Sequence, residues 1–97
     1  MEGTYQIEYQ SPFDSGKAIL QLTEKDDVLL GKLSIHEKDF ELTHGEQDQN
    51  RFNFTGKFSI LGIDIAYMIR GIVNDNILNA KVHTALGVIV ATGFKIK

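Results

Sequence analysis

The chain contains no cysteine and a single proline among its 97 residues. Without cysteine it can form neither a disulfide nor a thiolate metal site. The one proline, Pro12, lies in a turn-like segment, so we expect no strand to lose a backbone hydrogen-bond donor. A domain of this size buries roughly 60–70% of the surface of its unfolded chain, so one hydrophobic core can hold it without cross-links. We therefore expect one domain spanning residues 1–97.

Long apolar runs and basic clusters are also missing. No run approaches the length of a membrane span, and the first residues lack the basic start and apolar stretch of a signal peptide. Ten Lys and Arg stand against thirteen Asp and Glu, a net charge of −3, and the cations are scattered along the chain. A protein that binds nucleic-acid backbones would show a basic stripe. We expect a cytoplasmic protein that binds neither membranes nor nucleic acid.

Turn-forming residues recur about every twelve residues along the chain, the spacing of short strands. Gly, Asn and Asp dominate these segments because they tolerate positive φ and local hydrogen bonds. The predicted turns cover residues 12–16, 24–27, 36–39, 44–50, 61–62, 74–76 and 85–87. Connections this short join neighbouring strands antiparallel. The pattern predicts an all-β protein with eight antiparallel strands in an up-and-down meander.

Apolar and polar residues alternate between the turns, as in half-buried strands. Phe52, Phe54 and Phe58, for example, share one face of a predicted strand. Four predicted strands carry a glycine in mid-run: Gly31, Gly56, Gly71 and Gly93. Strand glycines accompany sharp coiling, which a small closed barrel requires, and closure also removes exposed sheet edges. We therefore predict a closed eight-stranded barrel, with a two-sheet sandwich as the alternative.

Three turns share a weak internal repeat. Each has a small polar residue, two apolar residues and then Gly or Asp: Ser11-Pro12-Phe13-Asp14, Ser59-Ile60-Leu61-Gly62 and Thr84-Ala85-Leu86-Gly87. The spacing indicates four hairpins that place similar turns at one end of the barrel. Turn chemistry alone can also produce such a pattern.

Several short motifs resemble a known group of proteins. They are Gly3-Thr4-Tyr5, Leu30-Gly31-Lys32-Leu33, Arg70-Gly71-Ile72-Val73 and Ala91-Thr92-Gly93-Phe94. They are similar to motifs of small repeat-containing β-barrel domains found alone or attached to flavin-dependent oxidoreductases of anaerobic bacteria, although the turn Pro12-Phe13-Asp14 lacks the glycine of that group. The resemblance implies a bacterial accessory domain without catalytic residues. Gly3-Thr4-Tyr5 also resembles the Gly-x-Trp opening of lipocalins and avidins, which implies a calycin-like barrel.

Residue patterns that would specify a reaction are missing. The histidines His36, His44 and His83 lack the i, i+2 spacing that places two imidazoles on one strand face, and we expect no metal site. Glu8 and Asp64 alternate with apolar neighbours and should face solvent rather than act as buried acids or bases. The serines lack a nucleophile motif, and the glycines form no phosphate-binding loop. We expect no catalytic residue and no cofactor.

Residues on the predicted inner face are the candidates for ligand contacts. Alternation places Tyr5, Tyr9 and Tyr67 inside the barrel with Phe54, and a buried phenol needs a hydrogen-bond partner. Around an open cavity, these four side chains would bind a small apolar or aromatic ligand. In a filled barrel the tyrosines would pack at the ends, with their hydroxyls reaching water. Eight strands are compatible with either arrangement, and close packing favours the filled one.

Apolar residues on the predicted outer face indicate a different role. Met68, Ile72 and Ile89, with Ile19 and Ala91, fall opposite the core positions, and a concentrated apolar patch marks an interface. Since two-fold dimers are the commonest oligomers, we expect Met68, Ile72 and Ile89 to form a homodimer interface. Three hypotheses follow. The first is a non-enzymatic binding domain for a small hydrophobic ligand, and the second is a filled-core homodimeric interaction or accessory module without one. The third and last is an enzyme on the same barrel that uses a histidine–carboxylate pair.

Overall fold

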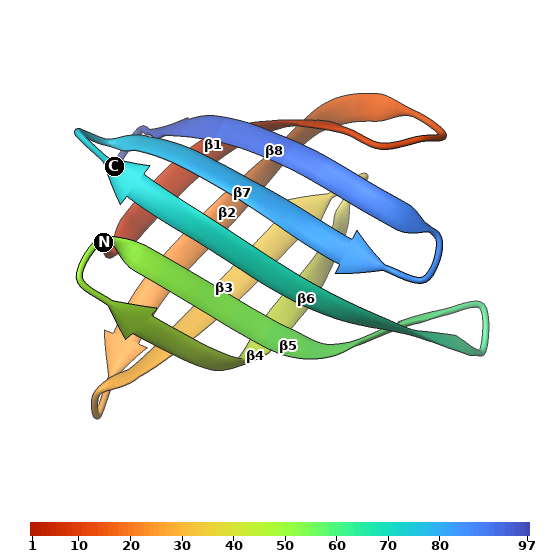
Figure 1. Cartoon of the computed structure of the whole chain (residues 1–97), viewed down its shortest axis with the longest axis horizontal. Coiled ribbons are helices and arrows are strands. Elements are labelled where there is room, and N and C mark those ends of the chain that lie inside the picture. Colours follow the sequence, from red (N-terminus) through yellow and green to blue (C-terminus); the bar gives the residue numbers. More distant parts are fainter.

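The protein is a closed barrel of eight antiparallel strands (Figure 1). The computed structural model describes the backbone of residues 1–97 and every side chain except that of Ile60. The strands are β1 (Gly3–Gln10), β2 (Ser15–Lys25), β3 (Val28–Ile35), β4 (Lys38–Asp48), β5 (Arg51–Ile60), β6 (Ile63–Asn74), β7 (Ile77–Thr84) and β8 (Gly87–Lys95). Each strand pairs with the next, and β8 pairs with β1. The predicted all-β up-and-down barrel is confirmed, and the two-sheet sandwich is wrong. Among the described residues, no helix has the length and apolarity needed to cross a membrane.

Tight two-residue turns join four of the hairpins. Both turn residues have positive φ in each of them: Asp26 and Asp27, His36 and Glu37, Leu61 and Gly62, Asp75 and Asn76. Positive φ at both positions is the type I′ geometry, whose twist matches that of the flanking strands. All seven connections fall within or overlap the predicted turns.

The predicted turn over residues 44–50 is too long. Strand β4 continues to Asp48, and a β-bulge interrupts its pairing with β3, where Leu29 pairs with Gly45 but Gly31 pairs with Leu42. His44 takes a positive φ of 52° at this bulge. The next residue, Gly45, must be glycine because a Cβ at this position would collide with the carbonyl oxygen of Leu29. The polar and glycine residues of this segment therefore form an irregular strand rather than a loop.

The middle of the barrel is occupied by large side chains from most of its strands. The most deeply buried, each at 2% exposure or less, are Tyr5, Leu22, Leu29, Leu42, Phe54 and Leu78. Burial of one such side chain stabilises the fold by about 1.5–3 kcal/mol. The predicted alternation is confirmed on β1, on β2 as far as Leu22, and on β7, where every second residue is buried or half-buried.

Two strand glycines make room for aromatic rings on the neighbouring strand. Gly56 pairs directly with Tyr67, and Gly71 pairs directly with Phe52. A Cβ on Gly56 would lie 2.6 Å from the Tyr67 hydroxyl oxygen, and a Cβ on Gly71 would overlap the Phe52 ring. Each ring thus lies against bare backbone, an arrangement that shields strand glycines and allows strong coiling.

The two ends of the barrel differ in polarity. One end holds both termini and the polar turns that follow β2, β4 and β6 (left in Figure 1). The other end, called here the mouth, holds the turns that follow β1, β3, β5 and β7. Three of these four turns expose a large apolar side chain: Phe13 at 76%, Leu61 at 95% and Leu86 at 59%. The three repeated turns of the sequence therefore lie together at the mouth, as their spacing predicts.

Candidate functional site

The two predicted ligand residues of β1 lie at opposite ends of the barrel. Tyr5 is 1% exposed near the termini, and its hydroxyl donates a hydrogen bond of 2.7 Å to the carbonyl oxygen of Met1. Tyr9 lies at the mouth, where its hydroxyl oxygen is 3.0 Å from Nε2 of His36 and its ring covers Gly16. Burial raises the pKa of both phenols. Each tyrosine therefore already has a protein partner for its hydroxyl.

Tyr67 and Phe54, the other two predicted ligand residues, are packed among aromatic rings. Tyr67 is 5% exposed, stacks on Phe58 with ring centroids 4.3 Å apart, and lies over Gly56. Phe54 has no exposed surface and packs edge-on against Phe52 at 6.0 Å. Since Tyr5 and Tyr9 lie at opposite ends, the four predicted residues do not line one common cavity.

The predicted interface residues divide between the two faces of the wall. Met68 is 39% exposed on the outer surface of β6, and Ile72 is half-buried on the same surface. The outward placement of Ile89 and Ala91 is wrong: Ala91 is only 8% exposed, and Ile89, two residues before it, points to the same inner side. Residues 88–91 are apolar on both faces, so alternation alone could not choose between them. The pairing of Ala91 with buried Ala80 decides the orientation.

No histidine, acidic or basic side chain is buried in the part of the chain whose side chains the structure describes. The three histidines and the two carboxylates considered above are all exposed: His36, His44, His83, Glu8 and Asp64. Among the described residues, no three His, Asp or Glu side chains come close enough to hold a metal ion. Asp39 accepts a 2.6 Å hydrogen bond from Ser34 and lies 3.4 Å from Lys32. The hydrogen bond from Ser34 is the main cause that lowers the pKa of the Asp39 carboxyl.

An apolar hollow opens at the mouth. Its lining includes Phe58, Ile65 and Ile89 from the strands, and Pro12 and Leu86 from the turns after β1 and β7. Its volume is about 190 Å³. The hollow therefore joins the interior of the barrel to the exposed apolar turns, and we take it as the candidate binding site.

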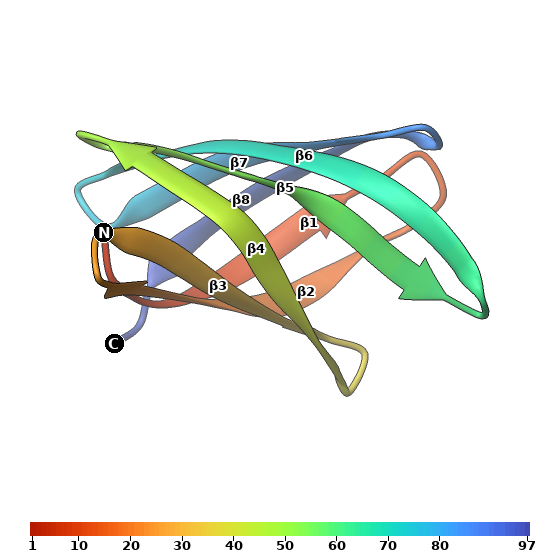
Figure 2. The ribbon, with the colours of Figure 1, turned by 90° about the horizontal axis from the view of Figure 1, so that it is seen from below.

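The wall of the barrel is split beside this hollow. Strands β4 and β5 pair at only three positions next to their shared turn, from Asp48–Arg51 to Glu46–Asn53. Beyond these positions the two strands diverge (Figure 2). Phe40 of β4 and Phe58 of β5 meet edge-on across the split, with ring centroids 5.2 Å apart. Phe58 thus lines the hollow, spans the split and stacks on Tyr67.

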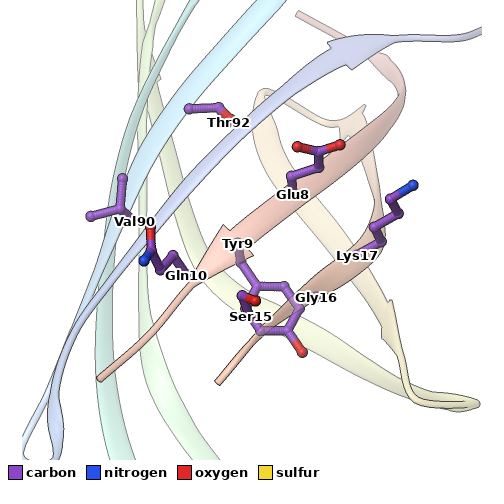
Figure 3. A pocket seen from close by; sticks show the side chains of 8 residues that line it. All are labelled: Glu8, Tyr9, Gln10, Ser15, Gly16, Lys17, Val90 and Thr92. Atoms are coloured by element: carbon purple, nitrogen blue, oxygen red, sulfur yellow. The ribbon is translucent and has the colours of Figure 1, made fainter. Parts of the chain in front are cut away.

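A second hollow on the outer surface differs in chemistry (Figure 3). It lies over β8, β1 and β2, with Glu8, Lys17 and Thr92 on its rim. Glu8 and Lys17 come from directly paired positions of β1 and β2. With a carboxylate and an ammonium group beside each other and a wide opening to solvent, this hollow does not suit an apolar ligand.

The candidate site differs from the one expected from the sequence. Phe58 and Ile65 were identifiable as inner residues, but alternation does not say how far along the barrel a residue lies. The apolar turns after β1, β5 and β7 did carry a signal, namely their shared repeat.

Comparison with known proteins found no matching family model, no matching curated protein and no matching solved structure.

Proposed function

We propose that this protein is a non-enzymatic binding domain that holds a small apolar or aromatic group in the hollow at the barrel mouth. The observation that carries the proposal is the hollow itself, with Phe58, Ile65 and Ile89 around it. A partly enclosed space among apolar side chains is a typical place for a small ligand. The exposed apolar residues Phe13 and Leu86 at its rim extend the apolar surface that such a ligand would contact.

The size of the hollow limits what it can hold. A cavity of about 150 Å³ lined by Leu, Ile and Phe binds benzene, whereas pockets for drug-sized ligands run from about 300 to 1,000 Å³. The hollow at the mouth, at about 190 Å³, is close to the first case. The expected occupant is a single ring or a short branched alkyl group, free or part of a larger molecule. A single free ring in a half-open site should bind with a dissociation constant on the order of 1 mM.

A homodimeric module joined through the outer surface is the second candidate. Met68, at 39% exposure, and Val88, at 42%, favour it. However, a two-fold axis at this surface would bring Arg70 and Lys81 of one copy close to the same residues of the other copy. Like charges facing each other disfavour association. The ligand-binding role is therefore the better supported of the two.

Toluene is a suitable probe of the proposed site. With isoleucine methyl groups labelled for NMR, we expect saturable shifts of the Ile65 and Ile89 methyls and nuclear Overhauser contacts from the toluene ring to both. The methyl of Ile7, which is 4% exposed away from the hollow, should not shift. Ile89→Phe should fill the hollow and weaken toluene binding at least tenfold. Val90→Phe adds the same ring on the outer side of the same strand and should leave binding unchanged.

The outcomes distinguish the two candidates. Contacts to Ile65 and Ile89 in the wild type would support the ligand-binding role if the Ile65 contact is lost in Ile89→Phe and kept in Val90→Phe. No saturable shift, or shifts spread over the outer surface, would contradict it. The contacts in the wild-type protein locate the ring without any variant, so the test does not depend on how well Ile89→Phe folds. A dimer in sedimentation velocity that Met68→Glu separates would instead support the second candidate.

A further inference from the structure

The charges of the chain are divided between the two halves of the barrel. Residues 1–48, which contain β1 to β4, carry four Lys and eleven Asp or Glu, a net charge of −7. Residues 49–97, which contain β5 to β8, carry six Lys or Arg and two Asp, a net charge of +4. Since the strands follow one another around the barrel, one side of this acidic protein is basic.

The cations of the two halves also differ in their surroundings. On the acidic side, Lys32 lies 3.4 Å from Asp39, and Lys17 stands directly opposite Glu8. On the basic side, Arg70 stands directly opposite a second cation, Lys81. Like charges at directly opposed positions destabilise a sheet. Across the part of the chain whose side chains are described, the Lys32–Asp39 contact is the one ion pair, so neither Arg70 nor Lys81 has a carboxylate in contact.

A hollow lies between these cations on the outer surface of β5 to β8. Arg51, Arg70 and Lys81 line it together with apolar Ile72 and Val90, and its volume is about 390 Å³. Asn79 adds an amide to the lining. The carboxylate nearest to the hollow in the strand pairing is Asp48, directly opposite Arg51. Three others lie farther out: Glu46 one strand beyond Asn53, Glu8 one strand beyond Thr92, and Asp75 in the turn after β6. The hollow therefore combines three positive charges with an apolar surface.

We propose that this hollow binds a small organic anion, with its phosphate or carboxylate group between Arg70 and Lys81 and an apolar part against Ile72 and Val90. A guanidinium fork suits either anionic group, and Arg51 is placed to supply a third positive charge. A bound anion would neutralise the repulsion between Arg70 and Lys81. The site lies on the outer wall rather than at the mouth, so the proposal is independent of the function proposed above.

Two probes distinguish the sources of the anionic group: phenyl phosphate and benzoate carry the same ring with different anions. In an amide NMR titration at low salt, we expect saturable shifts at Lys81, Ala80 and Val90 with at least one of the two. Arg70→Gln and Lys81→Gln should each weaken binding about tenfold, the effect of removing one charge-assisted hydrogen bond. Added salt should also weaken binding, because the site is open to solvent.

Lys17→Gln is the matched control. It removes one positive charge from the outer surface of the acidic half, leaves the net charge equal to that of the other two variants, and should bind as the wild type does. Equal weakening in all three variants would overturn the proposal, because it would show a response to net charge alone. Absence of saturable shifts with both probes would also overturn it, as would shifts confined to Gly87 and Ile65. The last pattern would place the ring of the probe at the mouth, and it would support the proposed function while contradicting this inference.

Discussion

The strained turn at Leu61 gives the sharpest prediction about the fold. Leu61 has a φ of +52° in the two-residue turn after β5, and its side chain is 95% exposed. A left-handed backbone costs an ordinary L-residue about 1–2 kcal/mol, whereas asparagine adopts it more readily. The change Leu61→Asn also places asparagine before Gly62, which is the preferred pair for a type I′ turn. We therefore expect this substitution to stabilise the protein.

The magnitude follows from the same geometry. Because the Leu61 side chain is almost fully exposed, its removal sacrifices little buried surface, and the relief of backbone strain should dominate. We expect a gain of about 1 kcal/mol in the free energy of unfolding. For a domain of this size, 1 kcal/mol raises the melting temperature by roughly 4–8 °C. Calorimetry and urea unfolding of the two proteins would measure both quantities.

Leu86→Asn is the control for this prediction. Leu86 is also an exposed leucine in a turn at the mouth, at 59% exposure, but its φ is not positive. The same chemical change should therefore give no stabilisation there. Equal melting temperatures for the wild type and Leu61→Asn would refute the reasoning. A similar rise in both variants would show that removal of exposed apolar surface, and not backbone strain, was responsible.

Three further predictions concern the wall and the core. Because amides on a strand alternate between its two neighbours, the amide of Lys57 points toward the split between β4 and β5, and the amide of Phe58 bonds to β6. The Lys57 amide should therefore exchange rapidly with deuterium and the Phe58 amide should be protected. Similar exchange rates would contradict the split. Gly71→Ala should lower the free energy of unfolding by about 1–3 kcal/mol, because the added methyl group would overlap the ring of Phe52. An unchanged midpoint of the urea unfolding transition would contradict this close contact. Burial raises the pKa of the Tyr5 phenol, so the stability it contributes is fully present below the unfolded pKa of about 10 and is lost as the pH rises through the folded pKa. Urea unfolding up to about pH 11 should show a smaller alkaline loss in Tyr5→Phe, and an equal loss would assign the effect to other groups.

The sequence predicted the barrel well because its signals were local. Turn residues such as Asp26, Asp27 and Asp75 act within two positions, and alternation acts between neighbours. Both signals weaken where the chain is irregular. The bulge at His44 combines polar residues and Gly45 within a strand, and local composition there favours a turn.

The candidate site was harder to predict because it depends on position along the barrel. Alternation identified Tyr5 and Tyr9 as inner residues, but the distance between the ends of β1 separates them. The orientation of Ile89 could not be derived from residues 88–91, since both faces of that segment are apolar. The charge difference between the two halves was present in the sequence, but Arg70 and Lys81 are eleven residues apart and become neighbours only through the pairing of β6 with β7.

The sequence by itself determined the class of fold, the number of strands and most of the turns, since each rests on interactions between residues close in the chain. Only the tertiary structure decided which side chains meet. The register of the strands places Phe58, Ile65 and Ile89 around the same hollow at the mouth. It also limits the pairing of β4 with β5 to three positions and places Arg70 directly opposite Lys81. Register depends on the closure of the whole barrel, where every strand must satisfy two neighbours at once. No single segment of the chain contains that information.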